Sequence, residues 1–283
     1  MISRGVKYML LATFVFAIMN VAVKYVSRIP AVEVIFFRSI VSLIMSGVAL
    51  KAQKVPLFGN NKKVLIARGV AGSAGLILFF ATLQAIPLAS AVTLMFLSPV
   101  FTTILGIWIV KESVRWVQWI FFAMCFGGIL VIQGFDERVS FWWAITGIGA
   151  AFFSGIAYNM IRKLKETEHP LVIVFYFPLV TLPVTIIYLF FDAVMPQGEE
   201  WLILILVGVL TQIAQYFMTK AYQSEELSKV SSVQYSGILY ALGFGWILFD
   251  ETFNFMTYLC MSLVLVGIVL NIAFKQQKAS KTN

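Results

Sequence analysis

Amide and phenol side chains recur in the second half of this chain, within stretches that are otherwise apolar. Gln212, Gln215 and Tyr216 lie in one such stretch, and Gln234 and Tyr235 lie in the next. Gln212 and Gln215 are three residues apart, so they share one face of a helix. An unpaired amide in an apolar environment costs roughly 2–7 kcal/mol, so these groups must face one another, water or a ligand. This set could bind a small polar molecule, or it could hold neighbouring helices together.

The first half of the chain adds an arginine, an amide and a hydroxyl to this set. Arg38 is the seventh residue of an apolar span, about 9–10 Å below the membrane boundary at about 1.5 Å per residue. Its guanidinium could grip a substrate carboxylate or phosphate at two points, or it could hold a neighbouring helix in place. Gln84 and Ser98, which precedes Pro99, could line the same site or serve helix packing.

The composition places these residues in a membrane. Hydrophobic residues make up 60% of the chain and charged residues 12%, against roughly 45–50% and 25% in soluble domains. A soluble core cannot bury so much apolar surface, whereas a bilayer can. The net charge of +8 is spread between apolar runs instead of forming one basic face, so we expect no nucleic-acid partner.

Ten apolar stretches are each long enough to cross about 30 Å of hydrocarbon. The first lacks a small-residue cleavage site and is followed by nine more, so we interpret it as an uncleaved anchor. The sequence therefore predicts an all-α polytopic membrane protein. Its ten predicted spans are 5–26, 32–50, 66–86, 88–110, 117–134, 142–160, 170–191, 201–223, 228–249 and 255–275.

The distribution of lysine and arginine predicts the orientation. With the N-terminus in the cytoplasm, 17 of the 21 basic residues fall in inner segments, among them Arg68. The outer segments hold only Lys24, Arg28 and Arg138. Because cytoplasmic loops carry the excess of basic residues, we expect both termini in the cytoplasm and the protein in the inner (plasma) membrane.

One stretch of the first half returns as a second copy in the second half. Leu88 to Glu112 aligns without a gap on Leu227 to Glu251, and we call the spacing from Leu88 to Leu227 the repeat offset. Each copy belongs to a set of five spans, and five is odd, so the second set enters the membrane from the opposite side. We therefore predict two inverted five-helix repeats, residues 1–138 and 139–275, followed by a cytoplasmic tail at 276–283. Inverted repeats of this kind favour transport, with the binding site near the midplane between the halves.

The chain resembles the EamA-type ten-helix members of the drug/metabolite transporter superfamily over essentially its whole length. The resemblance implies a central cavity lined mainly by the third, fourth, eighth and ninth helices. The second half departs from the family pattern, because Ile238 follows Gly237 where a proline is expected. The residues that carry the resemblance are Asn20, Phe37-Arg38, Leu97-Ser98-Pro99-Val100, Lys111-Glu112 and Asp250-Glu251. A further set is similar to a subgroup that includes S-adenosylmethionine carriers: Gln215-Tyr216, Lys220-Ala221-Tyr222 and Gln234-Tyr235.

The motifs that an enzyme would need do not occur in the sequence. There is no metal-ligand cluster, nucleophile elbow or ATP-binding loop, and the only histidine is His169. We therefore expect no enzymatic activity, no metal and no cofactor. The leading function is a secondary transporter that moves small organic metabolites, amino-acid-like or nucleoside-like, across the inner membrane by alternating access. Its partners would be that small molecule and the lipid bilayer, with the protein a monomer or homodimer. The alternative is a non-transporting membrane scaffold or a lipid scramblase-like protein.

Overall fold

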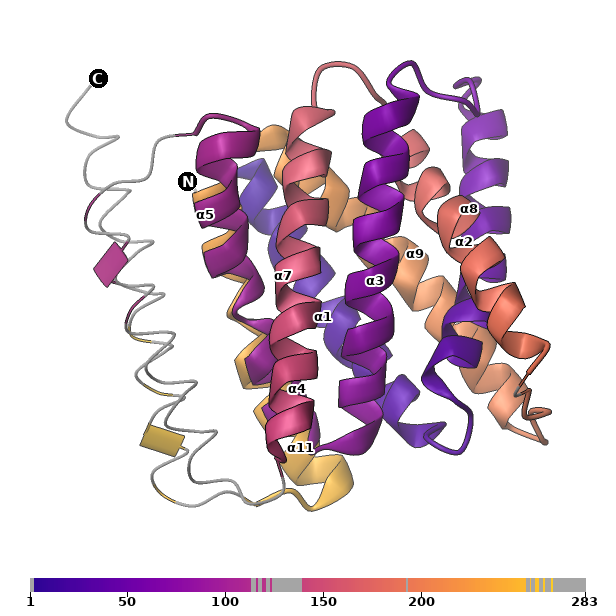
Figure 1. Ribbon diagram of the computed structural model, residues 1–283, viewed down its shortest axis with the longest axis vertical. Helices are drawn as coiled ribbons and strands as arrows, with labels where there is room; N and C mark the ends of the chain where they lie inside the picture. Colours follow the sequence, from indigo (N-terminus) through magenta and orange to yellow (C-terminus); the bar gives the residue numbers. More distant parts are fainter. Residues whose placement is uncertain are drawn as a thin grey trace.

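The computed structural model describes residues 3–112, 139–191 and 193–252, together with positions 116, 119, 120, 123, 255, 258, 259, 262 and 266. Over these residues the chain consists of helices joined by loops, and no strand occurs among them. The helices lie side by side along the long direction of the molecule (Figure 1). Their bounds are α1 Arg4–Tyr25, α2 Ala31–Ala52, α3 Lys62–Ala85, α4 Leu88–Met95, α5 Ser98–Ile109, α7 Phe141–Lys163, α8 Pro170–Leu189, α9 Glu200–Ser224, α10 Leu227–Gln234 and α11 Gly237–Phe249.

Seven stretches in the described part of the chain are long and apolar enough to cross a membrane: α1, α2, α3, α7, α8, α9 and the pair α4–α5. The prediction of an all-helical, polytopic membrane protein is thereby confirmed. The predicted span 228–249 is observed as two short helices, α10 and α11, of which α11 is strongly apolar. The predicted spans 117–134 and 255–275 lie outside the described residues, apart from isolated positions.

Apolar side chains occupy both the inside and the outside of the bundle. The buried ones form two clusters, one around Leu83 and Leu97 and the other around Leu65 and Val230. Large apolar side chains also lie exposed on α2, α8 and α9; they include Ile44, Val48, Ile187 and Leu202. Such a surface is unfavourable in water and matches the hydrocarbon of a bilayer.

Helices from the two halves of the chain pack against one another in an exchanged pattern. α1 packs on α9, α3 packs on α7, and α2 packs on α8. The repeat offset moves α1 onto α7, α2 onto α8 and α3 onto α9. The shift therefore turns the contact of α1 with α9 into the contact of α7 with α3, and it leaves the contact of α2 with α8 unchanged.

The exchange extends to single residues. A Cβ atom at Gly69 of α3 would lie 2.7 Å from the side chain of Val180 on α8. The positions related to this pair by the repeat offset meet in the same manner, since a Cβ at Gly208 of α9 would lie 2.5 Å from Val41 on α2. Small residues allow this close approach of membrane helices. The two glycines therefore allow an equivalent close approach of α3 to α8 and of α9 to α2.

Candidate functional site

Two of the helical stretches are interrupted at equivalent points. α4 ends at Met95 and α5 begins at Ser98; the repeat offset places these residues on Gln234, where α10 ends, and Gly237, where α11 begins. The first break is followed by Pro99 in the first turn of α5, where the missing N–H of proline is tolerated. The second break forms without a proline, so its position follows from the packing around it.

The two breaks contact each other inside the bundle. Phe96 lies at the first break and Tyr235 at the second, and their ring centroids are 5.5 Å apart. Gly237 allows this approach, because a Cβ there would lie 3.1 Å from the Phe96 ring and 3.0 Å from Thr13 of α1. Interrupted helices are tolerated in a membrane where they are buried in protein or line a cavity. Both conditions hold here.

A cavity of about 140 Å³ lies beside the two breaks and is lined by both halves of the chain. Its walls are largely aromatic and aliphatic. Ligand sites combine such walls with a few polar groups that fix the orientation of the ligand. The polar residues in the lining are Thr13, Asn20, Arg38, Arg68, Ser98, Ser154, Tyr158, Gln215 and Gln234, and the phenylalanines are Phe16, Phe79, Phe80, Phe96 and Phe177.

Two buried arginines give the cavity its positive charge. Arg38 of α2 is 2% exposed and Arg68 of α3 is 1% exposed. Their guanidinium carbons lie 5.3 Å and 4.2 Å from the ring centroid of the same residue, Phe177 of α8. Arg38 also lies 5.7 Å from the ring of Phe80. An aromatic face attracts a cation, so Phe177 fixes both guanidinium groups at one side of the cavity.

Gln215 and Gly72 complete the surroundings of Arg68. Nη2 of Arg68 donates a hydrogen bond of 2.9 Å to Oε1 of Gln215. A Cβ at Gly72 would lie 2.9 Å from both Nη1 of Arg68 and the ring of Phe177, so glycine leaves the room that these groups occupy. Nε of Arg38 and Nε and Nη1 of Arg68 have no hydrogen-bond partner among the described residues.

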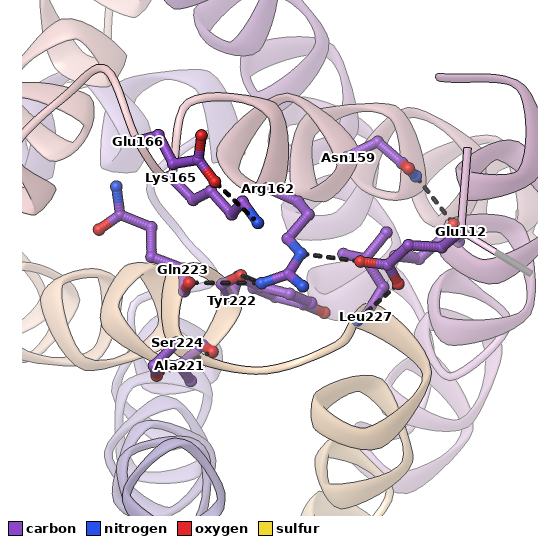
Figure 2. Close-up of polar contacts among 11 residues, drawn as sticks. Glu112, Asn159, Arg162, Lys165, Glu166, Ala221, Tyr222, Gln223, Ser224 and Leu227 are labelled. Atoms are coloured by element: carbon purple, nitrogen blue, oxygen red, sulfur yellow. Dashed lines mark hydrogen bonds and ion pairs between the residues drawn. The ribbon is translucent and has the colours of Figure 1, made fainter. Parts of the chain in front are cut away.

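At one end of the bundle, the carboxylate of Glu112 bridges the two halves of the chain (Figure 2). Its Oε2 accepts a hydrogen bond of 3.1 Å from the backbone N–H of Leu227, the first residue of α10. Its Oε1 accepts one of 2.8 Å from Nε of Arg162, which also donates to the carbonyl oxygens of Tyr222 and Gln223. A carboxylate at a helix N-terminus satisfies a free amide and interacts favourably with the helix dipole.

The equivalent carboxylate, Glu251, makes the corresponding contact at the other end. Its Oε1 accepts a hydrogen bond of 2.7 Å from the N–H of Leu88, the first residue of α4, and Oε2 accepts one of 3.3 Å from Ala89. Nζ of Lys24 lies 2.9 Å from Oε1 and also donates to the carbonyl of Ile86. Each interrupted stretch therefore begins at a carboxylate from the other half, and the two stretches run antiparallel.

The backbone presents both carboxylates in the same way. Lys111 and Asp250 follow α5 and α11 with φ angles of 58° and 50°, in the left-handed region. The N–H groups of Glu112 and Glu251 then donate to the carbonyl six residues earlier, over 3.2 Å and 3.0 Å. A residue in the left-handed region thus ends each helix and folds the following N–H back onto its last turns. The two carboxylates thus reach the other half through the same local geometry.

Sequence comparison assigns the chain to a family. The model of the EamA-like transporter family matches it twice, over residues 3–134 and 141–273. The chain belongs to the EamA-like transporter family. The motif resemblance described above is therefore confirmed, and the protein is a multi-pass membrane transporter.

Characterised relatives of this EamA transporter carry different substrate names. The pseudopaline exporter of Pseudomonas aeruginosa is 32% identical over 95% of this chain and 96% of its own length. The riboflavin transporter of Vibrio cholerae is 26% identical over 98% of this chain, and the S-adenosylmethionine uptake transporter of Rickettsia prowazekii is 23% identical over 97%. Each of these two matches covers 94% of the relative. A solved crystal structure covers 96% of both chains with a TM-score of 0.77 and 13% identity, which shows the fold alone.

Four of the eight binding residues predicted for this EamA transporter lie in the lining of the cavity: Arg38, Ser98, Gln215 and Gln234. They come from α2, α5, α9 and α10, so the fold brings together positions that are far apart in the sequence. Ser98 and Gln234 occupy the two helix breaks. Gln215 contributes through its contact with Arg68.

The two other predicted amides lie outside this lining and join helices to each other. Nε2 of Gln84 donates a hydrogen bond of 2.9 Å to the carbonyl of Ile29, between α1 and α2. Oε1 of Gln212 accepts one of 2.6 Å from the hydroxyl of Ser42 on α2. Amides commonly bridge membrane helices in this way.

The two predicted tyrosines also lie outside the lining of the cavity. Tyr216 packs against Phe217 at 5.6 Å between ring centroids, and Nζ of Lys220 lies 4.7 Å from its ring. Tyr235 is buried at the second break beside Phe96. Its position one residue after Gln234 turns the ring toward the other break instead of the cavity.

Five polar lining residues are missing from the predicted binding set: Thr13, Asn20, Arg68, Ser154 and Tyr158. Arg68 was counted with the basic residues of the inner segments; in the structure it is the seventh residue of α3 and its side chain is buried. A long basic side chain near a helix end can turn inward as well as outward, and charge counting cannot distinguish the two. Arg68 was only the third residue of the predicted span 66–86, whereas the observed helix begins at Lys62, so the depth argument applied to Arg38 extends to Arg68 only with the observed helix start.

The set of lining helices also differs from the family expectation. α1 contributes several residues, including Met9, Phe16 and Asn20, whereas α9 contributes Gln215. α1 packs along α9 and therefore covers much of the face that was expected to line the cavity.

Proposed function

We propose that this chain is a secondary carrier that moves small organic metabolites across the inner membrane by alternating access. One observation carries the proposal: the cavity is lined by two interrupted stretches, and equivalent carboxylates, Glu112 and Glu251, join the two halves at opposite ends. Carriers commonly bind substrate near the midplane, between two repeats that rock against each other. Release of one end would expose the cavity to one side of the membrane only.

Each carboxylate can act as a latch on its own end. Glu112 ties α5 to the start of α10, and Arg162 extends this link to α9. Glu251 ties α11 to the start of α4, together with Lys24 of α1. A hydrogen bond to a charged group contributes about 1.5–3 kcal/mol. Loss of one latch is therefore sufficient to shift an equilibrium between two conformations by roughly tenfold to a hundredfold.

We propose the same topology as the sequence predicts: ten spans in two inverted repeats, 1–138 and 139–275, with a cytoplasmic tail at 276–283. The two matches to the family model support the duplication. The antiparallel stretches and the exchanged helix contacts support the inverted relation. The excess of lysine and arginine in the inner segments supports cytoplasmic termini.

The proposed substrates are amino-acid-like or nucleoside-like metabolites. The names of the relatives, a pseudopaline exporter, a riboflavin transporter and an S-adenosylmethionine uptake transporter, support an organic metabolite with several polar groups. The cavity offers guanidinium, amide, hydroxyl and aromatic groups to such a molecule. The proposed binding residues are Asn20, Arg38, Arg68, Ser98, Tyr158, Gln215 and Gln234.

Cysteine labelling from each side of the membrane tests alternating access without a known substrate. The variant Ser98→Cys, with Cys125 and Cys260 replaced by serine, places one thiol in the cavity lining. Right-side-out and inside-out membrane vesicles are treated with an impermeant maleimide. A carrier should be labelled in both preparations. Ser46→Cys is the matched control, because Ser46 is buried in α2 outside the lining and should react in neither.

The alternative functions give other results in the same experiment. A rigid scaffold should show labelling of Ser98→Cys from one side or from neither. A lipid scramblase-like protein would move a fluorescent phospholipid between leaflets of proteoliposomes without two-sided labelling. Either result contradicts the proposed carrier.

A further inference from the structure

The positive charge of the cavity has no negative partner within the described part of the protein. The two guanidinium groups of Arg38 and Arg68 face the same ring, Phe177, so they also repel each other. Buried charges in proteins are normally paired, because burial removes their hydration. The ion pairs among the described residues lie at helix ends and in loops and include neither arginine: Lys24–Glu251, Arg28–Glu200, Arg162–Glu112, Lys165–Glu166 and Lys229–Glu225.

We propose that Arg38 and Arg68 together bind the carboxylate of a small organic anion. The inference rests on the proposed function, since it names the substrate class of that same cavity. Nε of Arg38 and both Nε and Nη1 of Arg68 are buried donors with no hydrogen-bond partner among the described residues. A guanidinium presents parallel N–H groups that match the two oxygens of a carboxylate. A bound carboxylate would balance the charge of these two guanidinium groups.

The rest of the lining indicates what the carboxylate is attached to. The walls include Phe16, Phe79 and Leu76, which suit an apolar or aromatic body. Asn20 is in the lining, and its buried Oδ1 has no hydrogen-bond partner among the described residues, so it can accept from a hydroxyl or ammonium group. The volume of about 140 Å³ lies below the range of roughly 300–1,000 Å³ for drug-sized ligands. The ligand that fits this conformation is therefore compact.

A purely structural role for the arginines would leave a different pattern of contacts. Arg162 shows that pattern, because its donors reach a carboxylate and two backbone carbonyls. Within the described part of the chain, Arg68 instead makes one hydrogen bond, to the neutral amide of Gln215. Its guanidinium carbon lies over the ring of Phe177, 4.2 Å from the centroid, and this contact satisfies no N–H donor. Positioned but unsatisfied donors are the arrangement of a preformed binding site.

Thermal melting of the purified full-length protein in a non-ionic detergent tests the proposal. The probes are compact carboxylates, each compared with its own amide: benzoate with benzamide, succinate with succinamide, and glutamate with glutamine. At least one carboxylate should raise the melting temperature more than its amide, because a ligand that binds only the folded state stabilises it. Arg38→Gln and Arg68→Gln should each weaken the apparent affinity by roughly tenfold or more. Arg28→Gln is the matched control and should bind as wild type, since Arg28 pairs with Glu200 far from the lining.

Lysine variants keep the test valid if the glutamine variants do not fold. Arg38→Lys and Arg68→Lys retain the charge and lose the planar fork, so they should remain folded and bind the carboxylate roughly tenfold more weakly. The proposal is overturned if no carboxylate differs from its amide in the wild-type protein. It is equally overturned if the variants at Arg38 and at Arg68 both keep the wild-type difference in melting temperature between a carboxylate and its amide.

Two further melting experiments test whether the arginines bind another anion, either inorganic phosphate or a lipid headgroup. Inorganic phosphate is tested in the same detergent solution, and stabilisation by phosphate alone would contradict a carboxylate site. The protein is also melted in nanodiscs of phosphatidylcholine with and without phosphatidylglycerol. An arginine-dependent effect of phosphatidylglycerol, with none from the carboxylates, would assign the charge to a lipid headgroup and overturn the proposal.

The experiments distinguish a failure of the carboxylate proposal from a failure of the carrier proposal. Two-sided labelling of Ser98→Cys without carboxylate binding would leave the carrier function standing and remove the anion assignment. Carboxylate binding with one-sided labelling would support the anion assignment and contradict the carrier function.

Discussion

The guanidinium carbon of Arg38 lies 5.3 Å from the ring centroid of Phe177, the residue on which the repeat offset places Arg38. The two residues therefore occupy equivalent positions of the two halves and contact each other where α2 packs on α8. Phe96 and Tyr235 do the same at the helix breaks. In the proposed inverted repeat, such contacts lie on the axis that relates the halves. In that arrangement the charge of Arg38 lies close to this axis.

Substitution of Gly72 should disturb the arginine site without touching its charge. In Gly72→Ala, the new methyl group would lie 2.9 Å from Nη1 of Arg68 and from the Phe177 ring, so the stacked pair must move. We expect the apparent carboxylate affinity, measured by thermal shift, to fall roughly tenfold. Gly149→Ala is the control, because its methyl group would meet only Leu78 at 3.4 Å. Equal affinities in the two variants would contradict this account.

Two glutamines on one helix should respond differently to the same substitution. Gln215→Leu removes the acceptor of Arg68 in the cavity and should weaken carboxylate binding by roughly tenfold, about the contribution of one hydrogen bond to a charged group. Gln212→Leu removes the partner of Ser42 instead. It should lower the melting temperature, by loss of about 1 kcal/mol, and leave affinity unchanged. Paired melting curves with and without carboxylate separate the two effects; the opposite assignment would show that the cavity lies on the Gln212 side.

Neutralising the glutamate of one latch should favour the conformation in which the cavity is open at that end of the bundle. Glu251→Gln keeps the shape of the side chain but loses the charge that meets Lys24 and the N-terminus of α4. Labelling of Ser98→Cys should become roughly tenfold faster from the Glu251 side, and slower from the other. Glu112→Gln should produce the reverse.

An exposed glutamate supplies the control for the latch experiment. Glu166 pairs with Lys165 in the loop after α7 and is largely exposed (Figure 2). Surface ion pairs contribute little, so Glu166→Gln should leave the labelling rates from both sides unchanged. If Glu112→Gln and Glu251→Gln both increased the labelling rate from the same side of the membrane, the two glutamates could not act as latches at opposite ends.

Stability should depend on pH through the histidine that caps α8. Nδ1 of His169 accepts a hydrogen bond of 3.3 Å from the N–H of Leu171, which requires a neutral ring. The pKa of His169 is lowered, first by partial burial and second by the charge of Lys220. The unfolded chain therefore binds this proton more readily than the folded protein. The stabilising contribution is complete above about pH 6.5 and is lost as pH falls through the folded pKa.

The comparison of two proteins isolates this contribution from other titrating groups. Melting temperatures are measured between about pH 8 and pH 5 for the wild type and for His169→Asn. Asparagine also caps helices and does not titrate, so the variant should lose less stability on acidification. Parallel curves for the two proteins would contradict the assignment.

The sequence was sufficient to predict an all-helical, polytopic membrane protein. The predicted spans 5–26 and 32–50 agree with α1 and α2 to within a few residues, because length and hydropathy decide which stretches can cross a membrane. The repeat offset also identified Glu112 and Glu251 as equivalent. Their contacts with the opposite half could not be predicted, because these contacts depend on how the two halves are packed.

The binding residues were harder to predict because their chemistry is shared with helix packing. Gln84 and Gln215 are both amides in apolar helices, and only the rotation of each helix about its axis decides which one lines the cavity. That rotation is fixed by close contacts such as Gly69 with Val180, which no pattern in one sequence reveals. The break between α10 and α11 was missed for a related reason, since no proline marks it.

The two carboxylate caps also bear on how such a chain could arise. The free amides at the start of α4 are satisfied by Glu251, and those at the start of α10 by Glu112, so each half lacks the partner for its own short helix. A single ancestral five-helix chain would meet the same need by pairing with a copy of itself inserted in the opposite direction. One glutamate position would then serve both ends of that dimer. Fusion of the two genes would preserve the arrangement and free each half to diverge, as Arg38 and Phe177 have done.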